Sequence, residues 1–260
     1  MQENIMIDTH AHLDFSQYDK DRDKVIEDAF SSGLETIINI GVDLESSEKS
    51  IKLAEKYKNI FATVGFHPHD ASKLSKDAFK ELEKLASHPK VVAIGEIGLD
   101  FYRNLSPENV QIRAFKEQIE LAKKLKLPVV VHIRNAYKKA LEILRTDATG
   151  LKGVLHCFSG DENEAKEALS LGFYLSFNGT LTYRNSKAAE LVKKIPLSSI
   201  LAETDCPYLT PEPLRGKRNE PKLVRLVIEK VVQLSGSHSF KEIDEIFSQN
   251  AKKLFRLDSK

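Results

Sequence analysis

Most histidines of this chain occur at one kind of place. Six of the eight come where a short apolar, β-branched run stops, and two acidic residues, Glu96 and Asp205, stop two further runs in the same way. The six histidines are His10, His12, His67, His69, His132 and His156. Imidazole and carboxylate groups are the ligands that Zn²⁺ and similar divalent ions use in proteins. The pattern therefore predicts one metal centre carried by the ends of successive strands.

Two sets of ligands follow from the spacing and from the order of the strands. His10 and His12 are two residues apart, so both point to the same side of a strand. Asp205 ends the last strand, which lies beside the first in a closed barrel, and glycines around Glu96 leave room for its carboxylate. We expect one ion to be bound by His10, His12, Glu96 and Asp205, and a second ion by Glu96, His132 and His156.

Each of these residues also has a simpler interpretation. A single His-X-His pair is more often hydrogen-bonded loop structure, a lone histidine more often donates to a backbone carbonyl, and a basic neighbour can neutralise a buried carboxylate. The metal hypothesis depends on the six residues occurring together. Two ions about 3.5–4 Å apart can share a water, lower its pKa and stabilise both oxygens of a displacement. Asp205 can move the proton of that water, so Asp205 and the bridging Glu96 are the candidate catalytic residues.

Cationic side chains near the predicted centre are candidates for holding a substrate. Residues 214–222 carry four cations and one acid directly after the last ligand strand, with Arg215 and Arg218 among them. Arg134, two residues beyond His132, points the same way, and His67 is expected to contact substrate instead of an ion. A solvated loop is the plainer interpretation of the basic run. Aromatic residues in the same loops can stack an unpaired base or roof the barrel; they are Phe101, Tyr102, Tyr183 and Tyr208.

These residues must be positioned by eight β/α units. Strand-like runs are predicted at 5–9, 34–41, 60–66, 90–96, 127–132, 153–157, 172–178 and 199–204. Amphipathic helices are predicted at 21–32, 45–58, 76–88, 107–126, 135–147, 161–171, 185–195 and 220–235. The strands are continuous apolar runs, as expected where helices cover a parallel sheet. The fold class is therefore α/β, a (β/α)8 TIM barrel of the metal-dependent hydrolase type with an extra C-terminal helix at 240–257.

Composition limits the remaining possibilities. The 260 residues are 41% hydrophobic and fit one domain, 1–260. Lys and Arg total 39 against 38 for Asp and Glu, so a nucleic acid must be held by a local patch. No apolar stretch is long enough to span a bilayer and the N-terminus lacks a signal peptide, so a cytoplasmic protein with reduced Cys157 and Cys206 is expected. The oligomeric state is open, with a monomer favoured.

Several motifs in order resemble one family over nearly the whole chain. They are Ile7-Asp8-Thr9-His10-Ala11-His12-Leu13-Asp14, Gly65-Phe66-His67-Pro68-His69, Gly95-Glu96-Ile97-Gly98-Leu99-Asp100-Phe101-Tyr102, His156-Cys157-Phe158-Ser159-Gly160, Glu203-Thr204-Asp205-Cys206-Pro207-Tyr208-Leu209 and Arg215-Gly216-Lys217-Arg218-Asn219-Glu220-Pro221. Together they resemble the TatD family of metal-dependent deoxyribonucleases. The resemblance implies an amidohydrolase-like TIM barrel, two divalent ions and hydrolysis of phosphodiester bonds in DNA, commonly from a 3′ end. It places the family's metal residues on the six ligands assigned above.

The chain departs from the family pattern at two points. Ile133-Arg134-Asn135 follows His132 where Ser or Thr and then Arg-Asp are frequent, and Cys206 stands where Ser is common. Neither departure touches the ligand set, but both bear on substrate preference.

The leading hypothesis is a metal-dependent deoxyribonuclease that hydrolyses single-stranded DNA or 3′ ends through a hydroxide bridging two ions. Mg²⁺, Mn²⁺ and Zn²⁺ are the candidate ions, and the ligands leave their identity open. One alternative keeps the metals and changes the bond, which gives an esterase, an amidohydrolase or a D-aminoacyl-tRNA deacylase. An alternative of another class is a non-catalytic binding protein with structural metals. No membrane partner is expected.

Overall fold

The computed structural model describes residues 5–257, which form a barrel of eight parallel strands in the order of the sequence. The strands are β1 Met6–Ala11, β2 Leu34–Ile40, β3 Ile60–Val64, β4 Val91–Asp100, β5 Val129–Arg134, β6 Gly153–Leu155, β7 Tyr174–Phe177 and β8 Ile200–Ala202. The last strand meets the first through a bridge between Ala11 and Cys206, and the Asp205 backbone N–H donates to the His10 carbonyl at 2.8 Å. These contacts bring Asp205 beside β1, as the predicted barrel requires.

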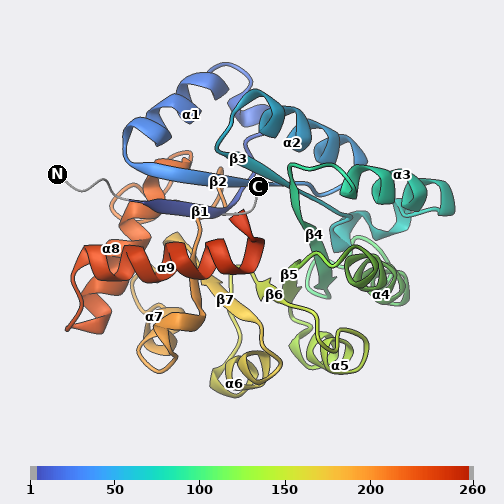
Figure 1. Cartoon of the computed structure of the whole chain (residues 1–260). Helices are drawn as coiled ribbons and strands as arrows, with labels where there is room; N and C mark the ends of the chain where they lie inside the picture. The colour runs from blue at the N-terminus through green and yellow to red at the C-terminus, as the bar shows by residue number, and fades with distance from the viewer. Residues whose placement is uncertain (1–4, 258–260) are drawn as a thin grey trace.

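Eight helices alternate with the strands and surround the barrel (Figure 1). They are α1 Arg22–Ser31, α2 Leu44–Lys56, α3 Lys76–Ala86, α4 Glu108–Leu125, α5 Tyr137–Asp147, α6 Glu162–Ser170, α7 Lys187–Val192 and α8 Val224–Ser235. Short 3-10 helices lie at Ser16–Tyr18, Pro68–Lys73, Gly179–Thr182, Leu197–Ser199 and Pro221–Leu223. The predicted fold class is confirmed. None of the helices within residues 5–257 is long and apolar enough to cross a membrane.

Side-chain caps fix where several of these helices begin. The Asp43 carboxylate accepts from the Ser46 backbone N–H before α2, and Asp161 and Glu164 form a reciprocal capping box at the start of α6. Each cap satisfies backbone donors that a helix start otherwise leaves without a partner, for about 1 kcal/mol. Such local hydrogen bonds explain why the predicted helix starts lie within a few residues of the observed ones.

The predicted additional helix is present as α9, Phe240–Phe255, and it lies across the amino end of the barrel (Figure 1). Its last turn is buried against side chains that fill the barrel interior. The cluster comprises Ile7, Ile38, Ile40, Phe61, Val92, Ala93, Val130, Val154, Leu201, Ala251, Leu254, Phe255 and Leu257. The helix therefore closes the end of the barrel opposite the one that carries the predicted ligands.

The ends of β4, β6 and β8 differ from the predictions. β4 continues to Asp100, so Glu96 lies inside the strand instead of ending it. β6 and β8 are shorter than predicted and stop at Leu155 and Ala202. Beyond them the backbone adopts positive φ values, 46° at Cys157 and 56° at Asp205, which turn the chain out of the sheet. His156 and Asp205 therefore sit on these turns, just above the strands that were expected to carry them.

Candidate metal centre

The two carboxylate oxygens of Glu96 face two different groups of side chains. Oε2 lies 3.4 Å from His10 Nε2 and 3.8 Å from His12 Nε2. Oε1 lies 3.0 Å from His132 Nδ1 and 2.9 Å from His156 Nε2. Glu96 is 3% exposed and stands at the middle of the centre. This is the position of a carboxylate that bridges two ions.

Asp205 completes the first group. Its Oδ1 lies 3.8 Å from His10 Nε2 and 3.5 Å from His12 Nε2, and the two imidazole nitrogens are 3.2 Å apart. His132 Nδ1 and His156 Nε2, in the second group, are 3.3 Å apart. The structure thus brings all six predicted ligands together, although the two predicted groups are not separate, because the rings of His10 and His156 stack with their centres 3.9 Å apart.

The donor atoms fit divalent ions in both spacing and chemistry. Nitrogen and oxygen ligands at 2.0–2.2 Å from a tetrahedral ion lie about 3.3–3.6 Å from one another. Most separations within each group are in or near this range. Three groups of His, Glu and Asp side chains could each hold an ion. They are His10 with Glu96 and His156, His10 with His12 and Asp205, and His67 with Glu96 and His132.

The second nitrogen of each ring shows which nitrogen is available to an ion. His12 Nδ1 lies 3.3 Å from the Ile40 carbonyl, so Nδ1 carries the proton and Nε2 faces the centre with its lone pair. His132 Nε2 lies 3.4 Å from Asp100 Oδ2, which leaves Nδ1 facing Glu96. His156 Nδ1 lies 3.5 Å from Glu203 Oε1, which leaves Nε2. His12 and His132 therefore each have a hydrogen-bond acceptor on the far side of the ring, and His156 has a carboxylate there at ion-pair distance.

His67 has the opposite arrangement. Its Nδ1 accepts a hydrogen bond from the His69 backbone N–H at 3.1 Å, so the neutral ring carries its proton on Nε2. Burial lowers the pKa of His67 to about 4, which keeps the ring neutral. Nε2 lies 3.4 Å from Glu96 Oε1. His67 consequently presents an N–H donor to the centre instead of a lone pair, although its position alone would suit a ligand.

Asp100 is the functional candidate that sequence reasoning did not single out. Its Oδ2 lies 2.8 Å from His69 Nε2 and near His132, and its Oδ1 accepts the backbone N–H groups of Tyr102 and Arg103. The spacing could have indicated Asp100 as a site residue, because Glu96 and Asp100 are four residues apart and face the same side of a strand. That indication was hidden by the expectation that β4 ends at Glu96.

Glu203, directly after β8, supports the centre from beside His156. It is fully buried, accepts the Cys157 backbone N–H at 2.8 Å, and accepts the hydroxyl of Ser176. These hydrogen bonds hold the carboxylate in place beside the ring. Such outer partners set the orientation of a ligand histidine.

Gly98 lets β4 and β5 approach closely beside the centre. Its φ is +141°, and a Cβ there would lie 2.0 Å from the carbonyl oxygen of His132. A side chain at this position would force the two strands apart. Glycine therefore contributes directly to the short distance between Glu96 and His132.

The carboxylates and imidazoles shift one another's protonation. Burial by itself would raise the pKa of Glu96, but the charge of His156 and hydrogen bonds from His10 and His132 outweigh it and hold the pKa well below its usual value. The pKa of His156 is raised well above its usual value because the charge of Glu96 outweighs burial. A divalent ion would replace such ring protons, so its binding releases protons and is favoured as pH rises.

Comparisons with known proteins agree with this geometry. A family model described as TatD-related DNase matches residues 7–256. The chain belongs to this family. It is similar to the uncharacterized metal-dependent hydrolase YabD of Bacillus subtilis, with 42% identity over 256 residues that cover 98% of this chain and 100% of the relative. It is also similar to a protein named 3′-5′ ssDNA/RNA exonuclease TatD from Cronobacter sakazakii, with 40% identity over 89% of this chain and 90% of that one.

A solved structure shows the same fold. The TatD homologue YJJV of Escherichia coli K12 superposes with a TM-score of 0.91 at 32% identity, covering 97% of this chain and 98% of that one. The predicted TatD-type barrel of the amidohydrolase superfamily is thereby confirmed. This TatD-family chain is a hydrolase with buried clusters of His, Glu and Asp suited to metal.

The structure separates the residues predicted to hold substrate in this TatD-family protein. Arg134 is exposed at the end of β5 and its guanidinium carbon lies 4.1 Å from the centre of the Tyr102 ring. The Arg215 guanidinium lies 4.2 Å from the centre of the Tyr183 ring, and this side chain is 60% exposed. Both arginines keep donors that face solvent.

Arg218 behaves differently from the expectation. Its guanidinium donates to both carboxylate oxygens of Asp21 at 2.8 and 2.7 Å, to Glu220 at 3.1 Å and to the Gln17 carbonyl at 2.8 Å. Two carboxylates surround this cation, so it ties the loop after β8 to the start of α1. The sequence could not show this pairing, because Asp21 lies almost two hundred residues away.

His88 and His238 lie outside the centre, as expected from their sequence positions. His88 Nε2 lies 3.3 Å from Glu55 Oε1, and His238 interacts with the Ser237 hydroxyl. Both cysteines are free, with Cys206 buried and Cys157 half-buried.

Proposed function

We propose that this protein is a metal-dependent exonuclease that removes nucleotides from the 3′ end of single-stranded DNA. The observation that carries the proposal is Glu96 between two imidazole groups, one oxygen facing each. The Cronobacter relative is named a 3′-5′ ssDNA/RNA exonuclease, which supports a single-stranded nucleic acid as the substrate. The site is the type that hydrolyses phosphodiesters with a pair of ions.

Each residue of the centre has a proposed role. One ion would be held by His10, His12, Glu96 and Asp205, and the other by Glu96, His132 and His156. Two divalent ions supply the charge that acidifies water and stabilises the oxygens of a phosphodiester during displacement; Mg²⁺, Mn²⁺ and Zn²⁺ are all candidates.

Asp205 is proposed to move the proton. Its side chain is 13% exposed, whereas Glu96 is almost completely enclosed, so Asp205 is the carboxylate of the pair that solvent and substrate can reach. Burial alone would raise the pKa of Asp205, but the hydrogen bond with His12 and the charges of His10 and His156 keep the pKa below its usual value. The carboxylate is therefore ionised and able to accept a proton at neutral pH.

His67 is proposed to donate a hydrogen bond from its Nε2–H to an oxygen of the scissile phosphate. The ring is neutral and its Nδ1 is engaged by the His69 backbone N–H, so the donor is fixed in direction. Arg134 and Arg215, at the rim, would contact phosphates further along the strand.

Exposed apolar side chains at the rim favour an unpaired strand. Within residues 5–257 the large apolar side chains with the greatest exposure are Tyr102 and Leu105, each 66% exposed, and Tyr208, 49% exposed. All three lie in the loops after β4 and β8, on the same end as Glu96. A base that is not paired can stack on such a tyrosine for about 1–3 kcal/mol. A duplex would keep its bases away from these rings.

The test compares oligonucleotides labelled at the 3′ and 5′ ends, with added Mg²⁺ or Mn²⁺ and with EDTA. We expect stepwise shortening from the 3′ end of single-stranded DNA, abolished by EDTA and by Glu96→Gln. Glu45→Gln, on the exposed face of α2, is the matched control and should keep full activity. Protein that binds both ions and leaves the DNA intact would refute the nuclease assignment. Cleavage from the 5′ end would refute the proposed direction.

A further inference from the structure

The amino end of the barrel carries a cavity that plays no part in the proposed hydrolysis. Its volume is about 670 Å³, within the range of small-molecule sites. The walls come from the segments that precede β5, β6, β7 and β8 and from the last turn of α9. Since the Glu96 centre lies at the carboxyl ends of the strands, the cavity and the centre are at opposite ends of the barrel.

The lining of this cavity, which we name the basal pocket, is strongly basic. Its cations are Lys123, Lys126, Lys152, Lys253 and Arg256, and among residues 5–257 no aspartate or glutamate lines it. Lys126, Lys152 and Lys253 make no ion pair with any residue from 5 to 257. The chain as a whole is nearly neutral, at +1, so this concentration of one sign is local.

Helix ends do not account for this charge. Lys126 and Arg256 are the C-terminal caps of α4 and α9, where a helix end carries about half a negative charge. Lys123 pairs with Glu120 at 2.7 Å, but the three lysines that make no ion pair within residues 5–257 still outweigh the half charges of the two helix ends. Lys152 lies in the loop before β6, outside any helix. The pocket therefore has cations in excess of what its own backbone can balance.

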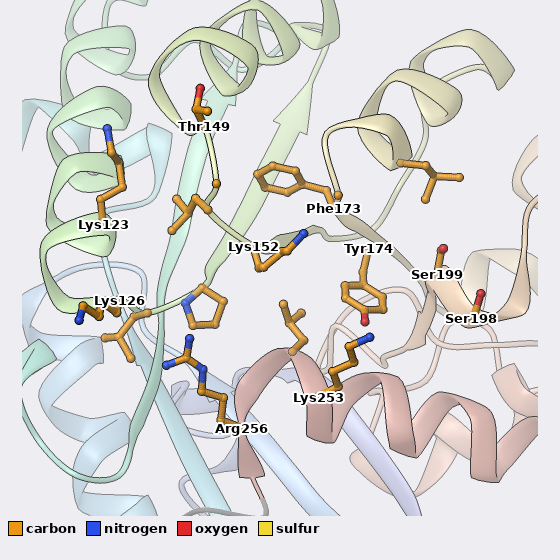
Figure 2. A pocket seen from close by; sticks show the side chains of 17 residues that line it. Lys123, Lys126, Thr149, Lys152, Phe173, Tyr174, Ser198, Ser199, Lys253 and Arg256 are labelled. Atoms are coloured by element: carbon orange, nitrogen blue, oxygen red, sulfur yellow. The ribbon is translucent and has the colours of Figure 1, made fainter.

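Lysine side chains lie on both sides of the Tyr174 ring. Figure 2 shows the Lys253 amine directed toward the Tyr174 hydroxyl and the Lys152 amine directed toward Phe173, with Lys126 and Arg256 on another side of the pocket. Gly172, with φ at +84°, makes room for Lys152, because a Cβ there would lie 2.7 Å from the lysine Nζ. The absence of a side chain at Gly172 thus leaves space for the ammonium group of Lys152.

Part of the wall is apolar and includes Leu127, Pro128 and Leu151. Hydroxyl groups of Ser198 and Ser199 lie on the rim (Figure 2). A ligand that matches this lining combines several negative charges with a flat or apolar portion. We propose that the basal pocket binds a nucleotide-sized organic polyphosphate, with the phosphates among the lysines and the ring system against the apolar wall. This proposal does not depend on the activity of the metal centre.

The test measures binding of ATP and of tripolyphosphate by titration calorimetry, with EDTA present to keep the metal centre free of ions that would themselves bind phosphate. We expect ATP to bind the unaltered protein, and more tightly than tripolyphosphate because only ATP can use the apolar wall. The pocket variant is Lys152→Glu with Lys253→Glu, which should weaken ATP binding at least tenfold. Binding should also weaken as NaCl is raised.

The matched control is Lys24→Glu with Lys52→Glu, which changes the total charge equally at exposed positions on α1 and α2. It should alter the ATP affinity less than twofold. The milder pair Lys152→Gln with Lys253→Gln provides a second pocket variant, and both variants should keep the thermal midpoint and the nuclease rate of the unaltered protein.

Three outcomes would overturn the proposal. They are no ATP binding by the unaltered protein, equal losses in pocket and control variants, and binding of tripolyphosphate as tight as that of ATP. Failure of the nuclease assay leaves these measurements intact, because they use metal-free protein and no DNA.

Discussion

The two ends of this barrel bury opposite kinds of side chain. At the carboxyl end, His10, Glu96 and Glu203 are each no more than 3% exposed and pack against one another. At the amino end, Leu254 and Phe255 of α9 fill the barrel with apolar atoms. Buried ionisable groups are costly unless they are paired or bound to metal, whereas buried apolar groups stabilise directly. The chemistry therefore depends on one end and much of the stability on the other, as in other barrels of this architecture.

Among the proposed substitutions, the largest effect on hydrolysis is expected at Glu96, at the carboxyl end of the barrel. Glu96→Gln keeps the shape of the side chain and removes the charge between the two groups. We expect hydrolysis to fall more than about a hundredfold, because even residues outside the ligand shell typically cost 10–100-fold. The same variant should lose the increase in thermal midpoint that added Mn²⁺ gives the unaltered protein. If the Glu96→Gln variant keeps both its activity and its stabilisation by Mn²⁺, Glu96 is not a residue of the metal centre.

At the other end the matching change is Phe255→Ala. Phe255 is 1% exposed, so its truncation should reduce the free energy of unfolding by about 3–5 kcal/mol. Urea unfolding in EDTA measures this loss. Below the transition the rate per folded molecule should equal that of the unaltered protein. A specific loss of rate in fully folded protein would show that the two ends are coupled.

The residues that hold the ligand histidines should give intermediate effects. Asp100→Asn removes the charge behind His132, and Glu203→Gln does so behind His156. Each should lower metal affinity or activity by about 10–100-fold. Titration with Mn²⁺, followed by heat release, separates lost affinity from lost rate. If both variants keep the Mn²⁺ affinity and the rate of the unaltered protein, Asp100 and Glu203 do not contribute to the function of the metal centre.

The smallest expected effect is at the rim. Tyr102→Ala should raise KM for single-stranded DNA about fivefold or more, the loss of roughly 1 kcal/mol of stacking, with kcat almost unchanged. Tyr57→Ala, beyond the end of α2, serves as the control because that ring lies away from the rim loops and bonds to Asp23. A fall in kcat with constant KM would indicate that Tyr102 orders the centre instead of stacking a base.

The fold was largely accessible from sequence because it depends on local patterns. Alternating apolar runs and amphipathic stretches predicted all eight β/α units and α9, and the ends of strands predicted where the six ligands meet. The extent of β4 was not accessible, since the ladder with β5 extends it to Asp100. That ladder is a contact between segments more than thirty residues apart.

The surroundings of the cationic side chains could not be predicted from the sequence either. Arg215 and Arg218 have equal standing in the sequence, yet the structure leaves the first at the rim and surrounds the second with Asp21 and Glu220. The protonated nitrogen of His67 likewise follows from the His69 backbone N–H above it. The basal pocket had no signal at all, because its cations come from three segments that are far apart in the sequence.

The sequence by itself determined the kind of barrel, its order and the residue types available for metal, because periodicity and strand ends are local properties of the chain. Only the tertiary structure decided which oxygen of Glu96 faces which imidazole, which arginine is neutralised and which cations line the basal pocket. These outcomes depend on distances of about 3–4 Å between segments remote in the chain, and hydrogen bonds and ion pairs form or fail over such distances.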